Sequence, residues 1–342
     1  MENAHKKVPA VILLILVSLF WASQPPPQTN ASHDESVLLL ARATDTSPHA
    51  LYKITLNEEG HLTKTTLLAA SEGYTLVNRT PEALDFARAA DEPPLRIMIE
   101  TGERLILEDE PTPSTDDPIQ HWTRQILAQV TPLSGPRDFY PFSSGVIFSM
   151  TGPADNFLNL YWLDSLGTIQ QLTSVEKMGD SPQPLLSASA EFLNWRPQFL
   201  SFLYRARQRD TQGQDHNELH LYSLNDFSDM PAPYFGKTPV WSADGDWLAG
   251  VRVNEATPPL YILWRVEWAT GETVEVGPGC NPDWSVSGDW LAYDGHDNSQ
   301  WQGYTDCYAN GRVYAQNTES SEVIELSAGI GGYVLLMGWM GG

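Results

Sequence analysis

The chain has 342 residues, of which 42% are hydrophobic and 18% charged, and its formal net charge is −23. This apolar content excludes wholesale disorder and is enough for a sizeable core without help from a metal or cofactor. The acidic excess would repel phosphate backbones, so nucleic acid is not an expected partner.

The N-terminal segment has the order of a secretory signal peptide. A positive head with Lys6 and Lys7 precedes an uncharged apolar run over residues 8–22, and a polar, proline-rich stretch follows. We therefore expect residues 1–23 to be a signal peptide and residues 24–35 a linker. A short membrane anchor is the alternative, because Phe20 fits poorly three positions before a cleavage site after Ala22. Both alternatives predict export to the periplasm, the extracellular space or the outer face of the cytoplasmic membrane.

From residue 36 to the C-terminus, short apolar strands alternate with turn sequences. Six units each begin with such a strand and continue with a second strand, a Gly- or Asn-containing turn and a third strand. The six leading strands are expected at residues 37–43, 83–90, 146–150, 198–205, 247–253 and 290–294.

A segment rich in proline and acidic residues, 108–137, lies between the second and third units. Asp117 can cap a helix that begins at Pro118. One face of this helix would be apolar and would pack on the side of the domain or over its centre, or else bind a partner. That face consists of Ile119, Trp122, Ile126, Leu127 and Val130.

Two stretches repeat each other 43 residues apart, WSADGDWLAG from Trp241 and WSVSGDWLAY from Trp284. A period of this length with one turn and short strands is typical of a β-propeller, in which each repeat forms one four-stranded blade. The residues expected to carry the structural repeat are Trp241, Asp244, Gly245, Trp247, Trp284, Gly288 and Trp290.

The last apolar strand begins at Tyr333, 43 residues after Trp290, and nothing follows it that could complete a blade. We expect it to complete the first unit. The predicted fold is therefore an all-β, six-bladed propeller of four-stranded blades closed by its C-terminal strand, since closure removes exposed sheet edges. A seven-bladed or truncated propeller is the alternative.

The two cysteines, Cys280 and Cys307, both lie near the C-terminal end. Export would favour a disulfide between them, tethering the long loop that contains Cys307. Long loops on one face of a propeller often bind partners. His296, Trp301 and Tyr304 in this loop are the candidate binding residues, although the two aromatic rings could also fold back onto the blade.

Residues 239–250, PVWSADGDWLAG, resemble the repeat of TolB-like propellers, in which Pro-x-Trp-Ser-Pro-Asp-Gly precedes a short apolar strand. Residues 281–293 are a looser match, and residues 194–197 resemble a degraded copy. Ala243 and Ser287 depart from the pattern. The resemblance covers roughly residues 194–324 and implies a propeller that binds other proteins in the cell envelope.

Catalytic and metal-binding patterns are not evident. The sequence H-N-E-L-H at residues 216–220 would place both histidines on one face of a strand, but about 13 Å apart, too far for one metal. No G-x-S-x-G element is present. We therefore expect neither a metal nor a cofactor.

These observations favour an exported, non-catalytic propeller that acts as a protein- or ligand-binding module at the cell envelope, with a protein or glycan partner and possible membrane attachment through the N-terminal segment. The alternative is a propeller hydrolase or lyase that uses carboxylates at the channel mouth. A purely structural role beside a neighbouring protein is a third possibility.

Overall fold

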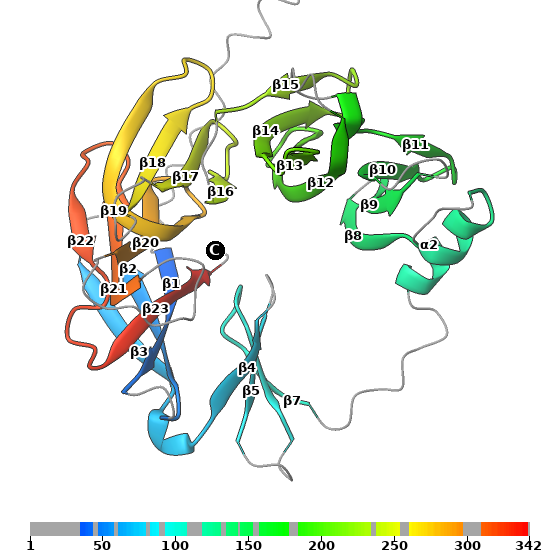
Figure 1. Cartoon of the computed structure of the whole chain (residues 1–342). Coiled ribbons are helices and arrows are strands. Elements are labelled where there is room, and N and C mark those ends of the chain that lie inside the picture. The colour runs from blue at the N-terminus through cyan, green and yellow to red at the C-terminus, as the bar shows by residue number, and fades with distance from the viewer. Residues whose placement is uncertain are drawn as a thin grey trace, which may run out of the picture.

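The computed structural model describes residues 35–43, 47–57, 61–79, 83–88, 93–107, 118–130, 135–142, 144–152, 157–177, 184–233, 237–253, 260–296 and 309–340. This part of the chain is nearly all β. Besides its strands it contains the α-helix α2 (Pro118–Leu127) and two single-turn helices, η1 (Ala70–Glu72) and η2 (Val175–Lys177). Figure 1 shows the strands grouped in sheets around a central opening.

Two of the sheets have four strands each. The first has the order β23-β1-β2-β3, with the strands at Tyr333–Trp339, Glu35–Arg42, Ala50–Leu56 and Leu62–Leu68. The second has the order β4-β5-β6-β7, with the strands at Thr75–Arg79, Ala83–Ala87, Leu95–Met98 and Arg104–Ile106.

An eight-stranded sheet consists of two groups of four strands. The first group contains β8 (Arg137–Phe142), β9 (Gly145–Thr151), β10 (Leu158–Asp164) and β11 (Ile169–Gln171). The second contains β12 (Leu185–Arg196), β13 (Ser201–Asp210), β14 (Asp215–Ser223) and β15 (Asp229–Pro231). Only the parallel pair of Leu158 and Ser189 joins β10 to β12, so the two groups are nearly separate sheets.

A seven-stranded sheet also consists of two groups, which share one long strand. Its strands are β16 (Lys237–Trp241), β17 (Trp247–Val253), β18 (Tyr261–Glu267), β19 (Thr273–Trp284), β20 (Trp290–His296), β21 (Ala309–Asn317) and β22 (Val323–Glu325). The first part of β19 pairs with β18 and its last part pairs with β20.

The C-terminal strand pairs with the first strand of the described chain, as the sequence predicts. β23 runs antiparallel to β1, with Leu335 opposite Leu40. Two carboxylates of the neighbouring group also hold it, since Asp294 accepts a hydrogen bond from the backbone N–H of Leu336 (2.8 Å) and Asp283 one from that of Trp339 (3.0 Å).

The repeated Trp-Ser element forms a tight turn around a buried serine. The Ser242 hydroxyl accepts a hydrogen bond from the backbone N–H of Trp247 (2.9 Å), and Ser285 receives the same bond from Trp290 (3.1 Å). Both serines are fully buried. Each hydroxyl links the strand before the turn to the strand after it, which is the physical reason why this element recurs.

Hydrophobic clusters join most neighbouring groups. One cluster of buried side chains runs from β17–β18 through β19–β20 and β23–β1 to β5–β6, and others join β9–β10 to β12–β14 and β13–β14 to β17–β18. Among the described residues, no cluster joins β4–β7 to β8–β11.

Helix α2 covers the remaining apolar face of β9 and β10. Ile126 is fully buried against Phe148 and Leu163, and the ring of Trp122 stacks on Phe139 at 6.0 Å. The predicted helix therefore packs on the side of the sheet. Its predicted apolar face is only partly buried, since the side chains of Ile119 and Leu127 remain half exposed.

No helix in the described ranges is long and apolar enough to span a membrane. The leader and linker, residues 1–34, lie outside these ranges, so the signal peptide and the membrane anchor stay predictions.

Candidate functional site

A cavity of about 220 Å³ lies where β8, β9 and β10 meet β12 and β13. It opens beside the single bridge between Leu158 and Ser189. Four apolar side chains form part of its wall, and the polar residues that line it are Asp138, Tyr140, Ser149, Ser189, Glu191 and Arg207. Its volume lies below the ~300–1,000 Å³ of typical ligand pockets, so it suits a small molecule or one end of a longer one.

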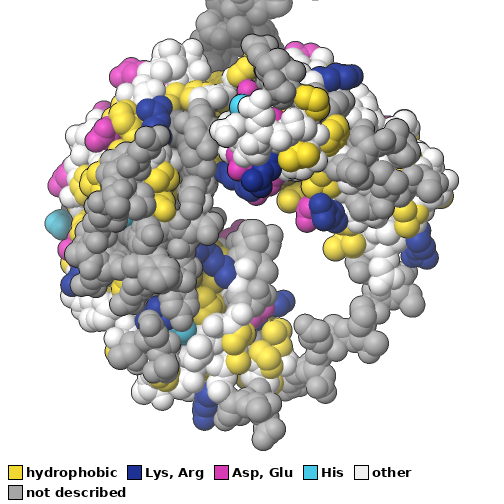
Figure 2. Space-filling view, viewed as in Figure 1, with side chains coloured by type: hydrophobic (Ala, Val, Ile, Leu, Met, Phe, Trp, Pro, Cys, Tyr) yellow, Lys and Arg dark blue, Asp and Glu magenta, His cyan; other side chains and the backbone are white. Residues whose placement is uncertain are grey.

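Strands β8 and β12, which contribute to the cavity wall, border the central opening of the molecule (Figure 1). In the space-filling view, acidic and basic side chains gather at the rim of this opening, next to β8 and to the inner ends of β12–β14 (Figure 2). The opening is hollow in this view as well, so a solute can approach the rim from the face shown.

Glu191 is held by two arginines of the adjacent strand. Its Oε2 atom lies 2.6 Å from Nη2 of Arg207 and 3.7 Å from Nη1 of Arg205. Glu191 lies opposite Arg205 in the β12–β13 register, which brings these groups together. The two guanidinium groups hold the carboxylate in place in the cavity wall.

Asp138 supplies the second carboxylate, from the neighbouring group of strands. Its Oδ2 atom accepts a hydrogen bond of 2.6 Å from the Ser149 hydroxyl. The backbone of Asp138 has a φ of 52°, and the β8–β9 register shifts between Arg137 and Tyr140. A bulge of this kind re-aims a side chain, which here directs the carboxylate toward Ser149 and the cavity.

Tyr140 adds a phenol to the two carboxylates. Its ring stacks on Phe192 with 4.2 Å between centroids. Burial, and then the charges of Asp138 and Glu191, raise the pKa of Tyr140 above its ordinary value. The phenol therefore keeps its proton at neutral pH and is a hydrogen-bond donor beside two acceptors, a combination suited to general acid–base chemistry.

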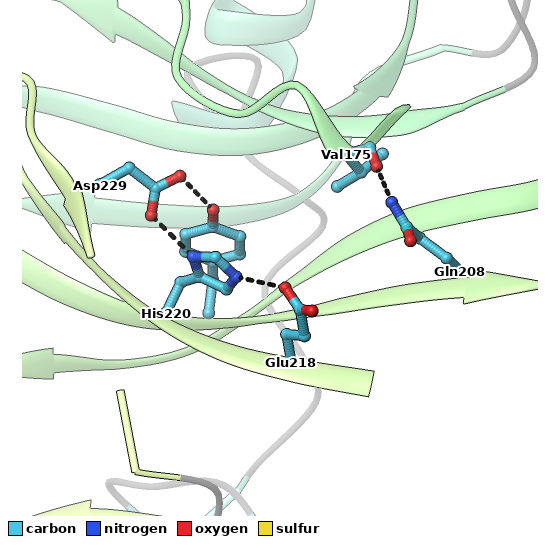
Figure 3. Close-up of polar contacts among 6 residues, drawn as sticks. Val175, Gln208, Glu218, His220 and Asp229 are labelled. Atoms are coloured by element: carbon cyan, nitrogen blue, oxygen red, sulfur yellow. Dashed lines mark hydrogen bonds and ion pairs between the residues drawn. The ribbon is translucent and has the colours of Figure 1, made fainter. Parts of the chain in front are cut away.

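A second polar cluster lies on β13, β14 and β15 (Figure 3). Asp229 accepts a hydrogen bond from the Tyr204 hydroxyl (2.6 Å) and bonds Nδ1 of His220 (3.0 Å), while Nε2 of His220 bonds Glu218 (3.2 Å). Burial acts to lower the pKa of His220, but the hydrogen bond and charge of Asp229, and then those of Glu218, outweigh it and raise the pKa. His220 and Tyr204 are almost fully buried, so their bonds to Asp229 fasten β15 to β13 and β14.

The structure places the predicted site residues in different settings. His296 ends β20, is only 5% exposed, and lies with its ring edge-on to Tyr261 at 5.1 Å. Trp301, Tyr304 and Cys307 lie outside the described residues, so a binding role for this loop and its disulfide to the buried Cys280 stay predictions. Within the described ranges, no group of three or more His, Cys, Asp or Glu side chains is placed to hold a metal ion.

Sequence reasoning missed Asp138, Tyr140, Glu191 and Arg207. Each lies on a strand with ordinary polar spacing, and no local motif distinguishes it. Alternation does place Glu191 on one face of its strand, but only the packing of two groups of strands brings it toward Asp138.

No family model and no curated protein matches the chain. Solved structures are similar at low identity. They include an oligogalacturonate lyase in complex with manganese, 10% identical over 78% of this chain and 91% of the other, with a TM-score of 0.42. A 6-phosphogluconolactonase-like protein from Bacteroides uniformis is 13% identical over 89% and 100% of the two chains, with a TM-score of 0.37. A prolyl endopeptidase is 12% identical over 72% and 40%, with a TM-score of 0.40.

These similar structures have propeller-type folds. The expectation of a non-catalytic binding module is corrected to this extent: the similar structures named here are those of enzymes, not of binding modules. Likeness at this level assigns neither substrate nor reaction to this chain, so the proposal below is built on the chain's own residues.

Proposed function

We propose that the protein is a hydrolase or lyase that performs acid–base chemistry on a small polyhydroxylated substrate in the cavity between β8–β10 and β12–β13. The observation that carries this proposal is the convergence of two carboxylates and a protonated phenol on one cavity. Asp138 and Glu191 line it together with Tyr140, whose pKa is raised by burial and then by the charges of both carboxylates.

The three groups differ in the role that their surroundings allow. Asp138 has the Ser149 hydroxyl as its close partner and is suited to accept a proton from the substrate or from water. Tyr140 is suited to donate its phenolic proton to the leaving oxygen. Glu191, fixed by Arg205 and Arg207, accepts hydrogen bonds from hydroxyl groups of the substrate and so orients it.

We also infer that the six groups of four strands are the blades of one ring that β23 closes. Support comes from the pairing of β23 with β1 and from the strand shared by the last two groups. The repeat is similar to that of TolB-like propellers at residues 239–250. With residues 1–23 as a signal peptide or anchor, the protein would work outside the cytoplasm, where oligosaccharides are available as substrates.

The test is an activity screen with matched variants. The full chain is incubated with a panel of oligosaccharides and sugar lactones. Reducing ends and the ultraviolet absorbance of unsaturated products distinguish hydrolysis from elimination.

For a substrate that is turned over, we expect D138N and Y140F each to lower kcat by about 100-fold or more. E319Q removes a carboxylate from the turn between β21 and β22 and is expected to leave kcat unchanged. Full activity in both D138N and Y140F would place the chemistry elsewhere.

A further inference from the structure

Strand β13 carries three arginines at alternate positions, Arg205, Arg207 and Arg209. Alternate residues of a strand point to the same face, and four residues of strand span about 13 Å. The exposed fractions of the three side chains are 14%, 51% and 56% in this order. The row therefore becomes more open to solvent toward the end of β13.

Polar side chains, three of them neutral, flank Arg207 and Arg209 on both neighbouring strands. Arg207 lies between Ser189 of β12 and Asn217 of β14, and Arg209 lies between Ser187 and Asp215. Two carboxylates contact the three arginines: Glu191 is shared by Arg205 and Arg207, and Asp215 lies 3.6 Å from Arg209. On this face of β12–β14 three arginines thus face two carboxylates, and Asp138 of β8 adds a third carboxylate only where the row meets the cavity.

The row reaches the cavity, because Arg207 and its neighbours Ser189 and Glu191 line the cavity wall. A molecule held in the cavity by one end could extend along β13 past Arg209. A guanidinium has five N–H donors in a planar fork that matches a carboxylate, so two half-exposed arginines in a row suit a chain of regularly spaced carboxylates. Serine and asparagine side chains suit sugar hydroxyls.

We propose that Arg207 and Arg209, with Ser187, Ser189 and Asn217, form a binding track for an acidic oligosaccharide built of uronic acid units, one end of which enters the cavity. The inference rests on the proposed function and names its substrate class. Single-stranded nucleic acid is the less suitable polyanion. The track residues include no aromatic ring on which bases could stack, and the charge of the whole chain opposes phosphate backbones.

The test measures binding separately from turnover. Isothermal titration of the full-length D138N variant uses three probes of equal length: a tetramer of galacturonic acid, its carboxyl-reduced neutral counterpart, and a short single-stranded oligonucleotide. We expect the acidic tetramer to bind at least 10-fold more tightly than the neutral one. Its affinity should fall as salt is added, because exposed charges are screened.

Two variants of the D138N chain localise the effect. R207Q/R209Q is expected to lose at least 10-fold in affinity for the acidic tetramer, with an unchanged far-ultraviolet spectrum and melting temperature within a few degrees. R312Q removes an exposed arginine that is paired with Glu325 on another sheet, and is expected to bind like its parent. Equal affinity for both tetramers, no binding of the acidic one, or tighter binding of the oligonucleotide would each overturn the inference.

The outcomes separate this inference from the proposed function. If the D138N chain binds acidic tetramers through Arg207 and Arg209 but the unmutated chain converts none, the track stands and the catalytic proposal fails. The opposite outcome is that the unmutated chain converts a neutral sugar, that D138N abolishes this conversion, and that acidic oligosaccharides neither bind nor react. The catalytic proposal would then stand and the track would fail.

Discussion

Gly245 and Gly271 have nearly the same backbone conformation, with φ of 74° and 72°, but different surroundings. A Cβ atom at Gly245 would lie 2.8 Å from the carbonyl oxygen of Pro197 and 3.1 Å from the ring of Phe199, whereas one at Gly271 would meet nothing within 4 Å. Gly245 is thus required both by its turn and by the close approach of the β12–β13 connection.

This pair gives a prediction at the residue scale. G271A should cost about 1 kcal/mol of unfolding free energy, because an alanine is strained at positive φ. G245A should cost clearly more, about 2–4 kcal/mol, since the Pro197 carbonyl must also move. Urea unfolding of both variants measures the difference. Equal losses would show that the contact with Pro197 is not a constraint.

Hydrogen bonds of single residues also link the degraded copy of the repeat, at residues 194–197, to the well-matched copy at residues 239–250. At residues 194–197 the serine turn is absent, but Asn194 and Arg196 donate hydrogen bonds to the carbonyl oxygens of Pro239 (2.8 Å) and Gly245 (2.8 Å). The degraded copy therefore anchors the better-matching one.

At the scale of elements, β15 depends on side chains more than on its ladder. It is three residues long and all three are exposed to some degree, and Asp229 in it bonds both Tyr204 and His220. Both ring nitrogens of His220 contact carboxylates, so the protonated ring satisfies both contacts at once.

The corresponding prediction concerns the pKa of His220. Because this pKa is raised in the folded state, protonated His220 contributes stability that is complete below its unfolded value, about 6.5. That stability is lost as the pH rises through the higher folded value. NMR titration should show that D229N lowers the pKa of His220 toward or below 6.5 and that E218Q lowers it less. An unchanged pKa in D229N would contradict the contact.

Helix α2 shows how an insertion can take the place of a neighbouring sheet. It covers β9 and β10 with Trp122 and Ile126, on a face that no cluster among the described residues joins to β4–β7. Amphipathic spacing predicts such a helix. Only part of its apolar face contacts the sheet, so Ile119 and Leu127 remain half exposed.

At the scale of the whole molecule, two buried carboxylates hold the C-terminal strand in place. Burial, the largest effect, raises the pKa of both Asp283 and Asp294 to about 6, although each accepts a backbone hydrogen bond from β23. Each carboxylate therefore opposes folding when ionised, and the contribution of these residues to stability is greatest below about pH 4 and falls as the pH rises through about 6.

We accordingly expect the melting temperature to fall between pH 5 and pH 7.5. For each carboxylate the loss from below pH 4 to above pH 6 is on the order of 2–3 kcal/mol, following from about two units of pKa, and about half of it falls between pH 5 and pH 7.5. D283N retains an oxygen that can accept from Trp339 but cannot ionise, so it should reduce the pH dependence. E319Q serves as the control. The same slope in D283N and the unmutated chain would show that Asp283 does not titrate in this range.

The sequence by itself determined the sheets and the repeat, since alternation of apolar residues and turn chemistry act over a few neighbours. It predicted the leading strand of each group and the pairing of β23 with β1. It did not predict β4, β8, β12 and β16, which precede the second to fifth leading strands. In the first three of these, polar and half-exposed side chains weaken the alternation that marks a strand.

Only the tertiary structure decided where chemistry is concentrated. Asp138, Glu191 and Arg207 belong to three strands in two groups, and they meet through the single bridge at Leu158 and Ser189. Conversely, His296, expected in an exposed loop, lies buried at the end of β20. Local sequence fixes the face of a strand on which a side chain lies. The side chain that it meets there depends on how separate sheets pack, which is set by contacts between residues far apart in the chain.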